Sequence, residues 1–360
     1  MIDEKQPFIL FSCCIPVKGH TKSLLCDVQR QEAMNIPNAM YEILEKHQGK
    51  SIEYIKSFYE NNYDDIIDEY YRFLADNELV FFDNHPESFP KLSLDWETPY
   101  DITNIIIDFG GDEDIVLRTV AQMNIVRCKA FQIRCFNNIS LQFIEQVLNG
   151  LEDNIIENIE IILRYQIENE HILLQDLVDK YKRIDRIIVY AAPDKYISHN
   201  SVECPIFYSK NTISEKNCGV IDESYFSVNI QTFTESQQYN TCLNRKISVD
   251  KDGYIKNCPS MSHHFGHIKD VQLADVIKQT AFTKFWNIKK DDIIKCKDCE
   301  FRHICTDCRA YLDEPDNIYS APLKCGYDPY TGTWEDYSNN PLKQKAIQYY
   351  ELSDIILPNN

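Results

Sequence analysis

Four cysteines stand within thirteen residues, in the stretch CKDCEFRHICTDC at 296–308. Cys296 and Cys299 form one C-x2-C pair, and Cys305 and Cys308 form a second pair after five residues. Two intervening residues allow a tight loop whose thiolates converge on one metal centre, and two such pairs suit a tetrahedral zinc knuckle. The stretch constrains the fold strongly, because its loops must close around sulfur ligands.

Three more cysteines extend the pattern over about 85 residues. Ten residues separate Cys242 from Gly253, and four separate Gly253 from Cys258. The alternation in KISVDKDGYIKNC predicts a β-hairpin that turns at 251–253 and brings these two thiols together. Cys325 follows the four-cysteine block after sixteen residues.

The order of these seven cysteines resembles the SPASM domain, the auxiliary iron–sulfur module of many radical-SAM peptide-modifying enzymes. The family usually has three residues, not two, in the last close pair, so this chain departs by one residue. The resemblance implies two interleaved [4Fe-4S] clusters. The ligands that it implies are Cys296, Cys299, Cys305 and Cys325 for one cluster, and Cys242, Cys258 and Cys308 for the other. Thiolates also suit zinc, which remains the alternative.

The pattern leaves the fourth ligand of the three-cysteine cluster open. Cys218 is a candidate because it is near in sequence, and so are His263, His264 and His267 in SMSHHFGH. For each histidine a surface or packing role is the commoner one. An open iron site is the third alternative.

The sequence lacks the C-x3-C-x2-C loop with which radical-SAM enzymes hold their catalytic cluster. Cys13 and Cys14 are adjacent, Cys26 stands alone, and six residues separate Cys128 from Cys135. DFGGDED at 108–114 is similar to the glycine pair that binds the cofactor's methionine amine, but a strand-to-helix turn also explains it. We therefore expect neither radical-SAM activity nor bound S-adenosylmethionine.

Periodicity divides the chain into four predicted parts of an α/β protein. Residues 1–85 read as short strands and three helices, a small winged-helix unit whose third helix carries Ile66, Tyr70, Phe73 and Leu74. Residues 95–235 alternate strands and helices, which predicts a partial or complete (β/α) barrel, and the resemblance implies a degenerate, partial barrel of radical-SAM type. Residues 236–336 form the cysteine-rich SPASM region, and 337–360 a helical tail.

The charge distribution excludes nucleic acid as a partner. The chain carries a net charge of −19, and residues 1–82 hold 14 acidic and 8 basic side chains, a net of −6. The third predicted helix, where a DNA reader needs a basic face, has four carboxylates against Arg72. Nucleic-acid affinity depends on neutralising phosphates, so this unit is no DNA reader.

No run of about 18 apolar residues predicts a membrane span, and the beginning of the sequence lacks a secretion-signal pattern. We therefore expect a cytoplasmic protein. In a reducing compartment cysteines bind metal or stay free thiols rather than form disulfides.

Further motifs point to a narrower resemblance. CIPVKG, DVQR and IPN at the beginning, and CGYDPYTGTWED near the end, resemble the SPASM-domain peptide maturases of grasp-with-spasm systems. The resemblance covers essentially the whole chain. It implies bacterial maturation of a ribosomally made peptide, with a precursor peptide, an ATP-grasp ligase and an exporter as partners. Three roles stay open: a redox maturase, a non-catalytic adaptor with structural metal that presents the precursor to the ligase, or a structural zinc protein unrelated to peptides.

The resemblance also gives the winged-helix unit a role. Units of this shape in peptide-maturation enzymes, the PqqD-like recognition elements, bind the precursor's leader as an added edge strand. The groove expected here lies between 32–36 and the helix at 64–75, and its acidic helix implies a leader with basic residues. The residues expected to line it are Glu32, Ala33, Met34, Asn35, Ile36, Asp64, Asp65, Asp68 and Tyr71.

Overall fold

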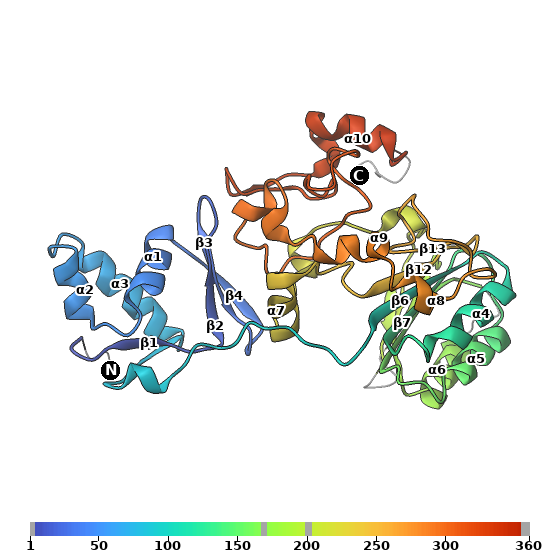
Figure 1. The fold of residues 1–360 in the computed structure, drawn as a ribbon, viewed down its shortest axis with the longest axis horizontal. Helices are drawn as coiled ribbons and strands as arrows, with labels where there is room; N and C mark the ends of the chain where they lie inside the picture. Colours follow the sequence, from blue (N-terminus) through green and yellow to red (C-terminus); the bar gives the residue numbers. More distant parts are fainter. Residues whose placement is uncertain (1–3, 167–170, 199–203, 354–360) are drawn as a thin grey trace.

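The computed structural model describes residues 4–166, 171–198 and 204–353. Figure 1 shows an N-terminal module at one end, a large sheet at the other, and the cysteine-rich segment between and above them. None of the helices in the described ranges combines the length and apolar character that a bilayer crossing requires.

The N-terminal module is a three-stranded antiparallel sheet followed by three helices. The sheet has the order β2 (Cys14–Val17), β3 (Ser23–Asp27), β4 (Glu32–Ile36). The helices are α1 (Asn38–His47), α2 (Ile52–Phe58) and α3 (Asp64–Asp76). Strand β1 (Phe8–Leu10) pairs antiparallel with β5 (Val80–Phe82), which closes the module.

The buried face of α3 differs from the prediction by one residue. Ile67, Tyr71 and Leu74 are buried, whereas Ile66 is 45% exposed. Both stripes satisfy a period of 3.6 residues, so periodicity alone does not choose between them. The choice comes from packing, because the ring of Tyr71 lies against the ring of Phe8 in the module's core.

The central sheet has eight strands and is mostly parallel. Its order is β10-β11-β9-β8-β7-β6-β12-β13, with parallel pairing from β12 through β6, β7, β8 and β9 to β11 and an antiparallel strand at each end. The strands are β6 (Ile102–Phe109), β7 (Cys128–Cys135), β8 (Asn158–Arg164), β9 (Ile184–Tyr190), β10 (Tyr196–Ser198), β11 (Ile206–Tyr208), β12 (Lys246–Val249) and β13 (Ile255–Lys256). The mixed α/β class is confirmed, and the sheet is open.

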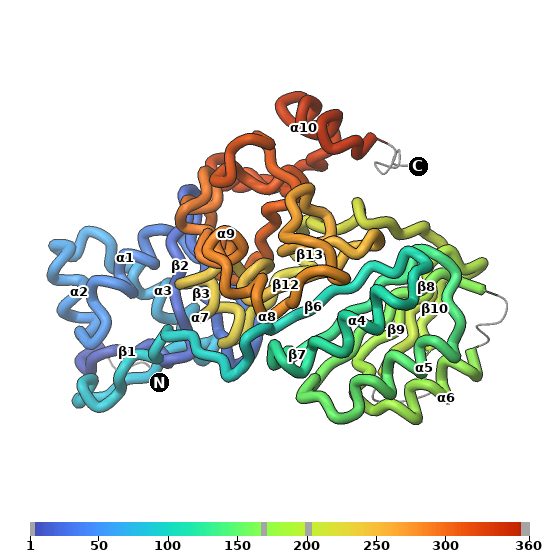
Figure 2. The backbone as a smooth tube through the Cα atoms, turned by 45° about the vertical axis from the view of Figure 1, so that its right-hand side comes forward, coloured from blue at the N-terminus to red at the C-terminus, as the bar shows by residue number. Residues whose placement is uncertain are grey.

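Three helices cover one face of this sheet (Figure 2). They are α4 (Glu113–Met123), α5 (Leu141–Gly150) and α6 (His171–Lys180), and their apolar sides pack on alternate strand residues in one continuous core. Strands β12 and β13 come from the segment expected to belong to the cysteine region. The sheet therefore continues directly into the segment that carries Cys242 and Cys258.

The cysteine-rich segment contains little regular structure. Its elements in the described ranges are α7 (Ile230–Gln238), α8 (Leu273–Val276), α9 (Thr280–Thr283), the small hairpin β14 (Tyr327–Asp328) and β15 (Thr333–Trp334), and α10 (Gln344–Tyr349), together with short 3-10 turns. The predicted hairpin at 251–253 is confirmed as β12–β13, and Gly253 turns it with φ of +86°.

The tip of the β2–β3 hairpin packs directly on the cysteine segment. The amide of His20 donates to the carbonyl of Asp298 at 2.9 Å, and Arg302 donates to the carbonyl of Lys18. A Cβ at Gly19 would lie 2.8 Å from the Cβ of Glu300, so only glycine fits there. The N-terminal module is thus attached to the residues between Cys296 and Cys305.

Candidate metal centres

Four thiols from four separate segments line one cavity of about 400 Å³. They are Cys218, which precedes a glycine turn, Cys242 before β12, Cys258 after β13, and Cys308. We call these four residues the first quartet. Gly219 makes the arrangement feasible: its φ is +86°, and a Cβ there would lie 2.7 Å from the Cys308 sulfur.

The thiols of the first quartet interact with one another and with a lysine. A hydrogen bond with Cys258 lowers the pKa of Cys218 to about 5 and raises that of Cys258. Lys246 of β12 reaches the Cys242 sulfur with its Nζ at 3.4 Å. Burial raises the pKa of Cys308 to about 12. The exposed Cys218 marks the solvent side of the site.

The other four cysteines of the motif gather around Lys290. Its Nζ lies 3.5 Å from the Cys305 sulfur and 3.9 Å from the Cys296 sulfur. Burial raises the pKa of Cys305 to about 12, an effect that Lys290 opposes and that Cys325 and Cys296 reinforce. Burial, followed by the charges of Cys296 and Cys305, also raises the pKa of Cys299. We call Cys296, Cys299, Cys305 and Cys325 the second quartet.

The spacing of the sulfurs tests which group fits. A tetrahedral zinc with Zn–S bonds of about 2.3 Å places its four sulfurs about 3.8 Å apart. Within the described ranges, no three sulfurs of either quartet lie within 4.8 Å of one another. A four-iron cluster separates its thiolates further, because each thiolate binds a different iron. The all-thiolate donor sets therefore suit an iron–sulfur cluster, and thiolates also suit zinc.

The three histidines lie elsewhere. His263 is exposed and packs edge-on against Phe265, while the ring of His264 lies on Tyr254. The Nε2 of His267 lies 2.9 Å from the carbonyl oxygen of Asp252. None of the three lines the cavity of the first quartet. The geometry thus brings Cys218 to the other thiols and gives the histidines packing roles.

The residues expected to bind a leader lie on β4 and α3. Among the described strands, β4 pairs only with β3, and Glu32, Ala33 and Asn35 are exposed. Tyr71 and Ile36 are corrections: each is only 1% exposed, in the module's core, so a peptide has no access to either side chain. The accessible apolar side of α3 is instead the stripe of Ile66, Tyr70 and Phe73.

The acidic face of α3 carries less free charge than the sequence indicates. The carboxylate of Asp68 lies 2.5 Å from the ammonium of Lys56, which Asp68 shares with Glu4, and Asp64 is partly buried. Asp65 and Glu69 remain exposed. The electrostatic contribution to peptide binding therefore depends mainly on these two side chains.

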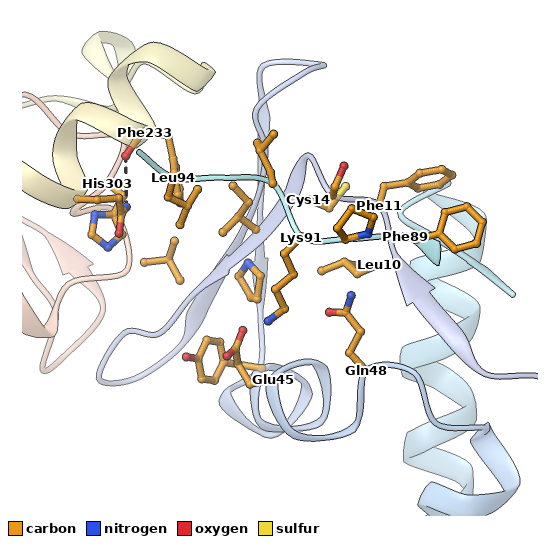
Figure 3. A pocket seen from close by; sticks show the side chains of 18 of the residues that line it. Leu10, Phe11, Cys14, Glu45, Gln48, Phe89, Lys91, Leu94, Phe233 and His303 are labelled. Carbon is orange, nitrogen blue, oxygen red and sulfur yellow. Dashed lines mark hydrogen bonds between the residues drawn. The ribbon is translucent and has the colours of Figure 1, made fainter. Parts of the chain in front are cut away.

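The opposite edge of the small sheet borders a cavity of about 720 Å³. Figure 3 shows Leu10, Phe11 and Cys14 on one side of it, with Phe89, Lys91 and Leu94 of the connecting segment crossing it and Phe233 and His303 beyond. The edge strand β2 contains Pro16, which has no amide to offer an added strand. Strand β4 is thus the edge that can accept another strand.

A glycine pair and a small thiol–carboxylate group lie near strand ends outside the two quartets. Gly110 and Gly111 follow β6, and a Cβ at Gly110 would lie 2.6 Å from the carbonyl oxygen of Lys251, so the pair permits tight packing on the β12–β13 turn. Sequence reasoning missed a second feature: the sulfurs of Cys13 and Cys14 lie within 4.8 Å of a carboxylate oxygen of Asp27. That carboxylate already accepts two backbone amides.

Comparison with known proteins gives a limited result. No family model matches the chain, and no curated protein matches it. Two solved structures of SuiB from Streptococcus suis are similar over most of the chain. SuiB bound to S-adenosylmethionine shares 13% identity, over 89% of this chain and 98% of that chain, with a TM-score of 0.34. SuiB bound to the precursor peptide SuiA shares 12% identity, over 87% and 98%, with a TM-score of 0.30. We base the functional assignment on the thiol geometry and the sequence motifs.

Proposed function

We propose that this chain takes part in maturing a ribosomally made peptide, as a precursor-binding protein with two [4Fe-4S] clusters. The observation that carries the proposal is the division of eight cysteines into two quartets, each beside a lysine. The motif resemblance to SPASM-domain maturases of grasp-with-spasm systems adds the ATP-grasp ligase as the partner that makes the bond. Iron–sulfur clusters supply one-electron transfer and iron coordination sites.

In this proposal, different residues bind the precursor and hold the two clusters. The amides and carbonyls along the open edge of β4 hold an extended precursor segment, and the stripe of Ile66, Tyr70 and Phe73 receives its apolar side chains. The second quartet, in which Cys296 and Cys305 are buried and Cys299 and Cys325 half-buried, anchors the N-terminal module through the β2–β3 tip. The first quartet opens to solvent at Cys218, so it is the quartet that a substrate can approach.

Cys218→Ala and His263→Ala separate the two candidates for the fourth ligand. We expect Cys218→Ala to lower the iron content by at least about one iron per chain and to alter the visible spectrum, because one iron loses its thiolate. His263→Ala should leave both unchanged, since its ring packs on Phe265. Iron and sulfide assays of protein purified without oxygen give the answer. Unchanged iron and spectrum in Cys218→Ala would remove Cys218 from the ligand set.

A further inference from the structure

Lys290 is a buried cation that contacts two sulfurs of the second quartet. It is 4% exposed, and its Nζ lies 3.5 Å from the sulfur of Cys305 and 3.9 Å from that of Cys296. In the described part of the chain its ion-pair partner is Asp307, at 3.5 Å. Burying an ammonium group requires a compensating negative charge, so the number of negative charges around Lys290 matters.

Asp307 does not neutralise Lys290 by itself, because it also pairs with Arg309. The Nη2 of Arg309 donates to Asp307 at 2.8 Å, while its Nη1 donates to the carbonyl of Ser320 at 2.7 Å. Lys290, Arg309 and Asp307 sum to a net charge of +1, and none of the three is more than 4% exposed. These three side chains therefore need one further negative charge nearby. The adjacent sulfurs of Cys305 and Cys296, as thiolates, are placed to supply it.

In the first quartet a half-buried lysine lies beside one sulfur, and a third lysine provides a contrast. Lys246 places its Nζ 3.4 Å from the sulfur of Cys242. Lys343 is equally buried, 5% exposed, but its Nζ bonds to the carbonyls of Leu323 and Cys325 and pairs with Asp313. Burial of a lysine in this region therefore does not by itself lead to contact with sulfur.

We propose that Lys290 and Lys246 are counter-cations of the two thiolate centres, donating hydrogen bonds to sulfur and favouring the reduced state of each cluster. This inference rests on the proposed function, since it requires iron–sulfur clusters at both quartets. One electron from an external low-potential donor adds one negative charge at the centre. Hydrogen bonds to sulfur and local charge are among the determinants of cluster potentials. An adjacent ammonium stabilises the added charge and raises the potential.

Lys290→Met tests the proposal in the full chain purified without oxygen. It removes the charge, keeps most of the length, and leaves Asp307 paired with Arg309. Titration with dithionite, followed by electron paramagnetic resonance, measures the potential of each cluster. For one cluster we expect an equilibrium constant for reduction at least about tenfold smaller, a shift of about 59 mV to more negative potential. Lys246→Met should shift the other cluster, whereas Lys290→Arg and the control Lys343→Met should stay close to the wild type.

Iron-loaded Lys290→Met with the wild-type potential would overturn the proposal, as would an equal shift in Lys343→Met. If Lys290→Met purifies without iron, Lys290→Arg decides. A fully loaded arginine variant supports the need for a cation, and an equally empty one contradicts it. Zinc and no iron in the wild type would instead refute the proposed clusters themselves, so the two failures are distinguishable.

Discussion

Cys305→Ala is expected to lose about half of the chain's iron and sulfide and to release the N-terminal module. Cys305 belongs to the second quartet and lies just beyond the residues that hold the β2–β3 tip. Without its thiolate the loop from Cys296 to Cys305 loses the centre around which it closes, and His20 and Lys18 lose their partners with it. Metal and sulfide assays measure the first effect, and limited proteolysis of the segment at 83–99 measures the second.

Cys128→Ala is the matched control. Cys128 is also buried, but it lies on β7, and its thiol donates to the carbonyl of Ala130. This variant should keep all its iron and the wild-type proteolysis pattern. Full iron content in Cys305→Ala, or equal iron loss in both variants, would contradict the assignment of the second quartet.

Asn35→Pro is expected to weaken binding of the precursor by about tenfold or more. Antiparallel strands alternate their bonding direction, and a proline in an edge strand directs its nitrogen to solvent. Pro16 is opposite Leu25 and Leu25 is opposite Met34, so the amides of Ala33 and Asn35 point out of the sheet. A proline at 35 thus removes an outward amide without breaking the β3–β4 ladder.

Fluorescence anisotropy with labelled synthetic versions of short peptides encoded beside the gene measures this effect. Asn35→Ala keeps the amide and should bind nearly as well as the wild type, and circular dichroism checks that both variants are folded. A folded Asn35→Pro protein with unchanged affinity would show that the peptide does not pair with β4.

The sequence predicted best what depends on local spacing. The hairpin at Gly253 follows from alternation within thirteen residues, and the helix and strand runs of the central sheet follow from apolar periodicity. Local patterns do not decide which face of a helix is buried when two apolar stripes differ by one residue. The stripes of Ile66 and Ile67 on α3 fit the helical period equally well, and packing in the module's core, including the ring of Phe8 on Tyr71, decides between them.

The sequence pattern does not predict which strands pair when they are far apart in the chain. Strand β12 pairs with β6 across about 140 residues of chain, and no local sequence feature identifies β6 as its partner. Cys218 was suggested by nearness in sequence, whereas its cavity with Cys308 depends on a glycine turn. The charge array of Lys290, Asp307 and Arg309 was missed, because two of its members resemble ordinary surface residues between the cysteines.

The most direct test of the account is the iron, zinc and sulfide content of the full chain purified without oxygen, with its visible spectrum. Two clusters predict about eight irons and eight sulfides per chain, a brown colour and a broad band near about 400 nm. Colourless protein with zinc and no sulfide would contradict the account. The two quartets would then be structural zinc sites, and the protein would be an adaptor that presents the precursor to its ligase.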